Sequence, residues 1–220
     1  MKTLGWLSIA FLSFAIAILA IAIYTLQPMG ANLPEAMRLS FLSHKSIVYT
    51  HIFASATALL LGPLQLLPIL RYHFPCIHRL AGRVYLGIGV LFGGLSGLYM
   101  AAHAYGGIVS KAGFTGLALM WLYTGLRAFL SIRQGRVAEH RQWVLRNFSL
   151  TFAAVMLRLY LPAAGLSGIP FDQSYPVIAW ICWAPNLIFV ELVFNRRRAS
   201  SAPRMPRRLD SERFGASEQV

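Results

Sequence analysis

Two histidines, His51 and His103, stand inside apolar stretches of this sequence. His51 lies about one helical turn into the run 46–70, and His103 lies near the end of the run 84–105. If consecutive runs are antiparallel helices, the two imidazoles lie at similar depth. Histidines on two facing helices can supply the two axial nitrogens of a b-type haem. The pair therefore predicts haem b as a cofactor, with polar histidines at a membrane interface as the alternative.

The neighbours of these histidines bear on the same prediction. A porphyrin is wide and flat, so the helices beside it need small side chains. Ser55, Ala58 and Gly62 follow His51 at helical spacing and predict a groove of small residues. Tyr99 lies one turn before His103. A stripe of small residues on the same run points away from His103 and is expected to allow close helix contact; it comprises Gly89, Gly93, Gly97 and Ala101.

Arg158 lies about one turn from the end of the run 143–162. A charge inside a membrane is costly and usually has a partner. A haem propionate at this depth would be a fitting partner for the guanidinium. The alternative is that the side chain extends to the nearby headgroups.

A second layer of histidines begins two similar phrases, "HRLAGRVY" at 78–85 and "EHRQWVLR" at 139–146. Each phrase puts a His–Arg pair at the mouth of an apolar run, with another arginine further on. The planar guanidinium of arginine suits phosphate and carboxylate groups. The phrases predict an anion or cofactor site, with simple orientation of the chain in the membrane as the alternative. Its candidate residues are His78, Arg79, Arg83, His140, Arg141 and Arg146.

Two further charges fall inside apolar runs, Arg127 and Glu191. They are expected at similar depth and are interpreted as a buried ion pair. Separate extension of each side chain to the headgroups is the alternative.

The composition indicates an integral membrane protein. Of the 220 residues 57% are hydrophobic and 12% are charged, whereas a soluble domain carries about 25% charged residues. The net charge of +13 does not indicate nucleic acid binding, because the basic residues lie between apolar runs and near the C-terminus. Cys76 and Cys182 form no CxxC motif, which argues against c-type haem and a thiolate zinc site.

The apolar runs predict an all-α bundle of six membrane-spanning helices within residues 1–198. The first run is interpreted as an uncleaved helix, because its apolar core exceeds the roughly 7–15 residues of a signal peptide. The expected spans are residues 5–27, 46–70, 84–105, 113–132, 143–162 and 176–195.

Arginine and lysine predict how the bundle sits in the membrane. The second and fourth joints and the C-terminal segment carry most of the arginines, which places both termini in the cytoplasm. We therefore expect a multi-pass protein of a bacterial inner membrane whose basic cytoplasmic collar contacts anionic lipid headgroups. Residues 199–220 are rich in Ser, Arg and Pro and predict a disordered tail.

Four phrases together resemble the bacterial predicted-membrane-protein family called domain of unknown function 2306. They are "HIFASATALLLGPLQLLP", "HRLAGRVY", "GLYMAAHAYGG" and "EHRQWVLRNFSLTFAAVMLRLYLP", and they cover about residues 47–162. Val144 departs from the family pattern, where methionine is expected after the tryptophan. The resemblance implies no established activity. The residues that carry it are His51, Gly62, Pro63, His78, Arg79, Gly82, Arg83, Tyr85, Gly106, Gly107, His140, Arg141, Trp143, Arg146 and Arg158.

Three functions follow from these patterns. The first is electron transfer through haem b, with a redox partner or a quinone. The second is a non-catalytic scaffold or assembly factor that uses the basic collar. The third is transport of a small solute or protons through Arg127, Glu191 and the outer histidines, His51 and His103; it ranks last, because the sequence has no internal repeat. No motif assigns a reaction, and an enzyme in its own right is not expected.

Overall fold

The structure is a computed structural model that describes residues 3–31 and 33–201, with the side chains of 4–31 and 33–193. The described chain is helical, without strands. Its helices are α1 (Thr3–Leu26), α2 (Glu35–Ser43), α3 (Lys45–Gln65), α4 (Pro68–His73), α5 (Pro75–Val84), the π-helix η1 (Tyr85–Phe92), α6 (Gly93–Ala102), α7 (Gly107–Arg133), α8 (Val137–Thr151), α9 (Ala153–Leu166), α10 (Phe171–Ile181) and α11 (Ala184–Ser201).

Six helical segments of the described chain are long and apolar enough to cross a membrane, which confirms the expected six-helix architecture. They are Leu4–Leu26, Lys45–Gln65, Pro75–Ala102, Gly107–Arg133, Val137–Leu166 and Phe171–Val193. The third and fifth segments begin earlier than expected, at Pro75 and Val137. The two basic phrases, at 78–85 and 139–146, are themselves helical. Proline suits the first position of a helix, as in α5, and an arginine near the end of a membrane helix can extend its side chain to water. Most of the tail expected from residue 199 lies outside the described residues.

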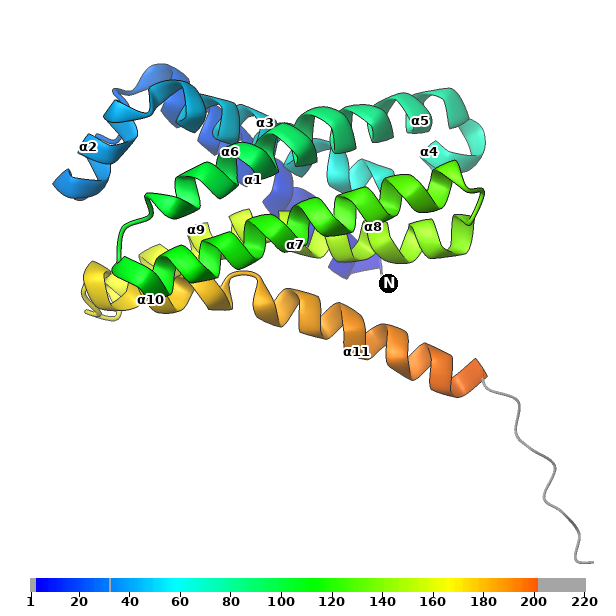
Figure 1. The fold of residues 1–220 in the computed structure, drawn as a ribbon. Coiled ribbons are helices and arrows are strands. Elements are labelled where there is room, and N and C mark those ends of the chain that lie inside the picture. Colours follow the sequence, from blue (N-terminus) through cyan, green and yellow to red (C-terminus); the bar gives the residue numbers. More distant parts are fainter. Residues whose placement is uncertain (1–2, 32, 202–220) are drawn as a thin grey trace, which may run out of the picture.

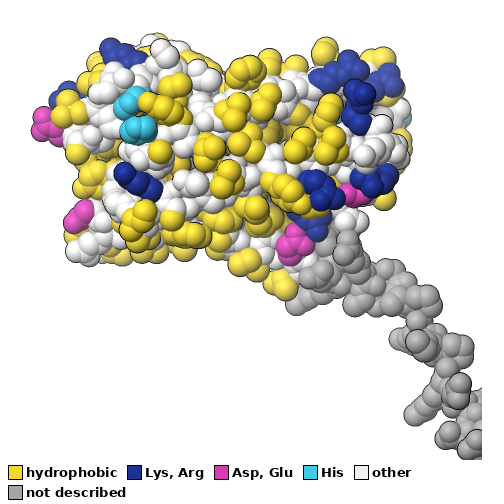
Figure 2. Space-filling model, viewed as in Figure 1, with side chains coloured by type: hydrophobic (Ala, Val, Ile, Leu, Met, Phe, Trp, Pro, Cys, Tyr) yellow, Lys and Arg dark blue, Asp and Glu magenta, His cyan; other side chains and the backbone are white. Residues whose placement is uncertain are grey.

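The two ends of the bundle differ (Figure 1). One end, here called the cavity end, holds α2 and the turn between α9 and α10. The other, here called the basic end, holds α4, α5 and the turn between α7 and α8. Most Lys and Arg side chains on the face drawn in Figure 2 gather at the basic end, while hydrophobic side chains cover the middle. The start of α1 and the far end of α11 both lie toward the basic end.

The second and third spans meet along a stripe of glycines. A Cβ on Gly89 would lie 2.7 Å from the Cβ of Ala58, and a Cβ on Gly93 would lie 3.0 Å from the Oγ of Ser55. A Cβ on Gly97 would lie 3.0 Å from the Cε1 of His51. The glycines therefore let α3 approach η1 and α6 closely, as expected of a small-residue stripe.

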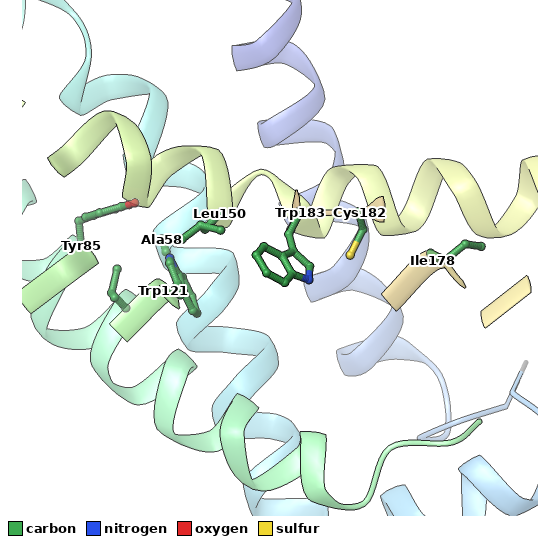
Figure 3. Close-up of a cluster of buried hydrophobic side chains, with 9 residues drawn as sticks. Ala58, Tyr85, Trp121, Leu150, Ile178, Cys182 and Trp183 are labelled. Atoms are coloured by element: carbon green, nitrogen blue, oxygen red, sulfur yellow. The ribbon is translucent and has the colours of Figure 1, made fainter. Parts of the chain in front are cut away.

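A polar network joins η1, α7 and α8 inside the apolar core. Asn147 is fully buried; it accepts a hydrogen bond from the Tyr85 hydroxyl at 2.7 Å and donates to Trp121 O at 2.8 Å and Thr124 Oγ1 at 2.9 Å. The Trp121 indole donates to Thr151 Oγ1 at 2.9 Å. Figure 3 shows Tyr85 and Trp121 in this core beside Ala58 and Leu150, with Trp183, Cys182 and Ile178 of the sixth span further along. When all the hydrogen bonds of buried polar groups are formed, such a network specifies how the helices pack.

Candidate functional site

A cavity of about 420 Å³ lies in the half of the bundle toward the cavity end. Helices α1, α2, α3, α6, α7, α9 and α10 all contribute to its wall. Most of the lining side chains are apolar, and Arg158 is the only Lys, Arg, Asp or Glu among them. The polar groups that converge on the cavity include Tyr24, His51 and Ser55. A concave apolar space with a few polar groups is the usual form of a small-molecule site, for which volumes of about 300–1,000 Å³ are typical.

His51 presents one free nitrogen to this region. Its Nδ1 lies 2.9 Å from the carbonyl oxygen of Gly93. Because a carbonyl only accepts, Nδ1 carries the proton, and Nε2 of the neutral ring is left as an acceptor. One turn along α3, the Ser55 Oγ is buried and has no hydrogen-bond partner among the described residues. Two polar groups on adjacent turns of α3 thus keep unused hydrogen-bonding capacity.

Arg158 of α9 has no carboxylate partner in the described chain. Its Nη1 donates to Ala154 O one turn earlier, at 3.1 Å, and it forms no salt bridge with any described residue. Tyr24 and His51 both interact with it electrostatically. A mostly buried guanidinium with five donors therefore lies beside the cavity with little of that capacity used.

The expected matched depth of His51 and His103 is wrong. His103 stacks on Tyr99 at a ring-centroid distance of 4.8 Å, and its other neighbour is His44, at 4.6 Å. His44 is the N-cap residue directly before α3, and it precedes His51 by seven residues, or about 10 Å along the helix axis. His51 instead contacts Gly97, six residues before His103. The two imidazoles therefore lie on different levels, and they do not fit as opposite axial ligands of one iron.

The expected groove of small residues is also wrong for two of its three members. Ala58 is fully buried against η1, and a Cβ on Gly62 would lie 2.4 Å from the Phe148 ring of α8. Neither residue lines the cavity, whereas Ser55 does. Small residues permit either a ligand or a neighbouring helix to approach, and here two neighbouring helices do so.

At the basic end, the residues predicted to form one anion site fall into separate groups. Arg79, Arg83 and Arg141 are exposed, and Arg79 donates to Cys76 Sγ at 3.4 Å. Arg146 binds Glu191 of α11 through two hydrogen bonds, of which the bond from Nη2 to Oε2 measures 2.9 Å. His78 bonds to Gln65 at the end of α3, whereas Nδ1 of His140 lies 2.8 Å from Ala128 O of α7.

The expected pair of Arg127 and Glu191 is wrong, because each residue has a nearer partner. Glu139 lies in the first turn of α8, directly after the short turn from α7. It accepts hydrogen bonds from Arg127 at 3.1 Å and from the Trp143 indole at 3.1 Å. The α11 helix contacts α8, and this contact brings Glu191 to Arg146. Both pairs hold helices together at the basic end.

The family model "Predicted membrane protein (DUF2306)" matches residues 48–194. The chain belongs to this family. No curated protein and no solved structure gives a significant match. The part that matches the DUF2306 family contains His51, Arg158 and the whole basic end, but α1 precedes it. Because Ala17 and Tyr24 of α1 line the cavity, this site extends beyond the family segment.

The sequence interpretation missed three residues of these sites. His44 is not among the residues that the sequence predicts for a site, but it packs against His103. Arg71 is not among them either, although its Nε is buried. Gln65 is buried at the end of α3, and its side-chain amide bonds to α5. The amide nitrogen donates to His78 Nδ1 at 3.1 Å, and the amide oxygen accepts from Gly82 N at 3.3 Å. A polar glutamine at the end of an apolar run was the available signal for the last of these.

Proposed function

We propose that this DUF2306 protein binds, in its cavity, a largely apolar molecule whose polar head carries acceptor oxygens. The supporting observation is that Arg158 lies beside an apolar cavity without a carboxylate partner in the described chain. A carboxylate or a quinone carbonyl would accept from its free donors. Ser55 Oγ and the acceptor nitrogen of His51 would hold a hydroxyl of the same head. The basic end faces the cytoplasm of a bacterial inner membrane, so the ligand binds in the outer half of the bilayer.

The first test is ligand binding by Arg158 variants of the full chain in detergent. A short-chain ubiquinone and a brominated fatty acid serve as probes, and both quench tryptophan fluorescence; Trp121 lines the cavity and reports on it. Arg158→Gln removes the charge and the donor fork, so we expect the dissociation constant to rise about tenfold or more. Arg133→Gln is the matched control, because this exposed arginine does not line the cavity. Equal binding by both variants would reject the proposal.

Haem b is the second candidate occupant, and the observation that favours it is the meeting of His44, His51, His103 and Arg158 beside one cavity. Arg158 would bind a propionate, and a single histidine would be the protein ligand of the iron. The absorption spectrum of purified protein tests this directly, since a b-type haem gives a Soret band that sharpens on reduction. A colourless protein that binds neither probe leaves the scaffold function.

A further inference from the structure

Two histidines meet at the cavity end, where the second span begins and the third span ends. The ring centroids of His44 and His103 lie 4.6 Å apart, with an interplanar angle of 41°. Tyr99 packs against both rings, at 5.4 Å from His44 and 4.8 Å from His103. The membrane-spanning segments here are Lys45–Gln65 and Pro75–Ala102, so both histidines lie directly outside them. His103 is exposed and His44 half-buried, and histidine side chains are visible on the surface of this end (Figure 2), so dissolved ions can reach them.

The backbone fixes the orientation and the protonation of both rings. His44 directly follows α2, and His103 directly follows α6. Nδ1 of His44 lies 2.8 Å from Ser40 O, and Nδ1 of His103 lies 3.0 Å from Tyr99 O. Because a carbonyl oxygen only accepts, each Nδ1 carries the proton, and each Nε2 of the neutral ring keeps a lone pair. Metal-binding histidines usually have this arrangement, in which the other ring nitrogen donates to a backbone carbonyl or a carboxylate.

Nothing in the described chain uses the two free nitrogens. The hydrogen bonds of both histidines with described residues involve Nδ1 alone, and neither ring forms a salt bridge with a described carboxylate. Both rings lie at helix C-termini, which carry a partial negative charge and favour a bound cation. Two imidazoles on one tetrahedral ion, with metal–nitrogen bonds of about 2.0–2.1 Å, have ring centroids about 5 Å apart. The observed spacing of 4.6 Å is close to that value.

We propose that Nε2 of His44 and Nε2 of His103 together bind a divalent transition-metal ion such as Zn²⁺. Imidazole is a preferred ligand of zinc, copper and nickel, whereas Mg²⁺ prefers oxygen ligands. The described chain forms no group of three or more His, Cys, Asp or Glu residues that could hold a metal, so water fills the other positions of the ion. The ion joins the start of α3 to the end of α6 and fastens the second and third spans beside the cavity. The site does not rest on the ligand proposed for the cavity.

The test is a calorimetric titration of the full chain with Zn²⁺ in detergent, after removal of metals and without a polyhistidine tag. His103→Gln is expected to weaken Zn²⁺ binding by at least about tenfold, because even the loss of a partner of a metal ligand typically costs about 10–100-fold in affinity. His73→Gln is the matched control and should bind as the unaltered protein does. His73 is also exposed, but it lies on α4 at the basic end and has no ring contact with a described residue.

The double variant His44→Gln/His103→Gln distinguishes one shared ion from two independent ones. If one ion needs both nitrogens, the double variant binds Zn²⁺ about as weakly as either single variant. Additive losses would overturn the proposal, as would an equal loss in His73→Gln or equal affinity for Mg²⁺.

A second measurement needs no variant and therefore does not depend on whether the variants fold. Cu²⁺ added to the unaltered protein is expected to show nitrogen hyperfine coupling from two imidazoles in its electron paramagnetic resonance spectrum. A spectrum without that coupling would overturn the site.

Discussion

At the residue scale, the side chains that matter most for packing are polar ones inside the apolar core. Asn147 uses its amide to join η1, α7 and α8 through Tyr85, Trp121 and Thr124. An unpaired polar group within a membrane protein has no nearby water to bond with. The network therefore specifies one packing of three spans, and each member depends on the others.

Truncation of Asn147 tests this network. Asn147→Ala removes the group that accepts the Tyr85 hydroxyl proton, leaving that hydroxyl with Thr151 and Trp121, and it opens a small void, so we expect a loss of about 1–3 kcal/mol in the free energy of unfolding. Ser149→Ala is the control, since within the described residues its hydroxyl bonds to Arg146 O of its own helix and to no other span. The measurement is denaturant unfolding in mixed micelles. Equal losses in both variants would contradict a special role for the network.

At the element scale, the π-helix η1 stands in the middle of the third span. Its residues Tyr85 and Gly89 both contact other spans: Tyr85 through the polar network and Gly89 through Ala58 of α3. π-helical segments are rare and frequently occur where function requires a local change of register. Here η1 lies between α5 at the basic end and the glycines of α6 that line the cavity.

Two glycines of η1 allow a matched comparison. A Cβ on Gly89 would meet Ala58 backbone atoms at 3.0 Å, so Gly89→Ala must push α3 away; we expect a loss of about 1–3 kcal/mol in stability. A Cβ on Gly87 would find nothing within 4 Å, so Gly87→Ala is expected to be neutral or slightly stabilising. Thermal unfolding of both variants provides the measurement. A similar Tm for the two would mean that the α3–η1 contact is loose.

At the scale of the whole molecule, charge divides the bundle into two ends. The paired carboxylates Glu139 and Glu191 lie at the basic end, yet the arginines there outnumber them, while the cavity end holds Glu35 and Asp172 with few basic residues. Such asymmetry predicts that the basic end faces the cytoplasm.

Reporter fusions test this orientation. A reporter that is active only outside the cytoplasm, fused after residue 199, is expected to give no signal, because the start of α1 and the far end of α11 lie toward the basic end. The same reporter inserted in the turn at Gly106 is expected to be active, since that turn belongs to the cavity end. The opposite pattern would place the cavity in the inner half of the bilayer.

The sequence alone determined the membrane class, the six spans and the basic end, because these depend on local hydropathy and on the placement of charge. The tertiary structure decided which faces meet. Helix periodicity puts Ser55, Ala58 and Gly62 near one face, but only packing shows that η1 and α8 occupy two of these positions. Similarly, depth estimated from run ends paired His51 with His103, whereas the contacts pair His44 with His103. The rotation and the register of one helix against another depend on contacts between residues far apart in the sequence. An error of two helical turns in the register therefore changes which residues are in contact.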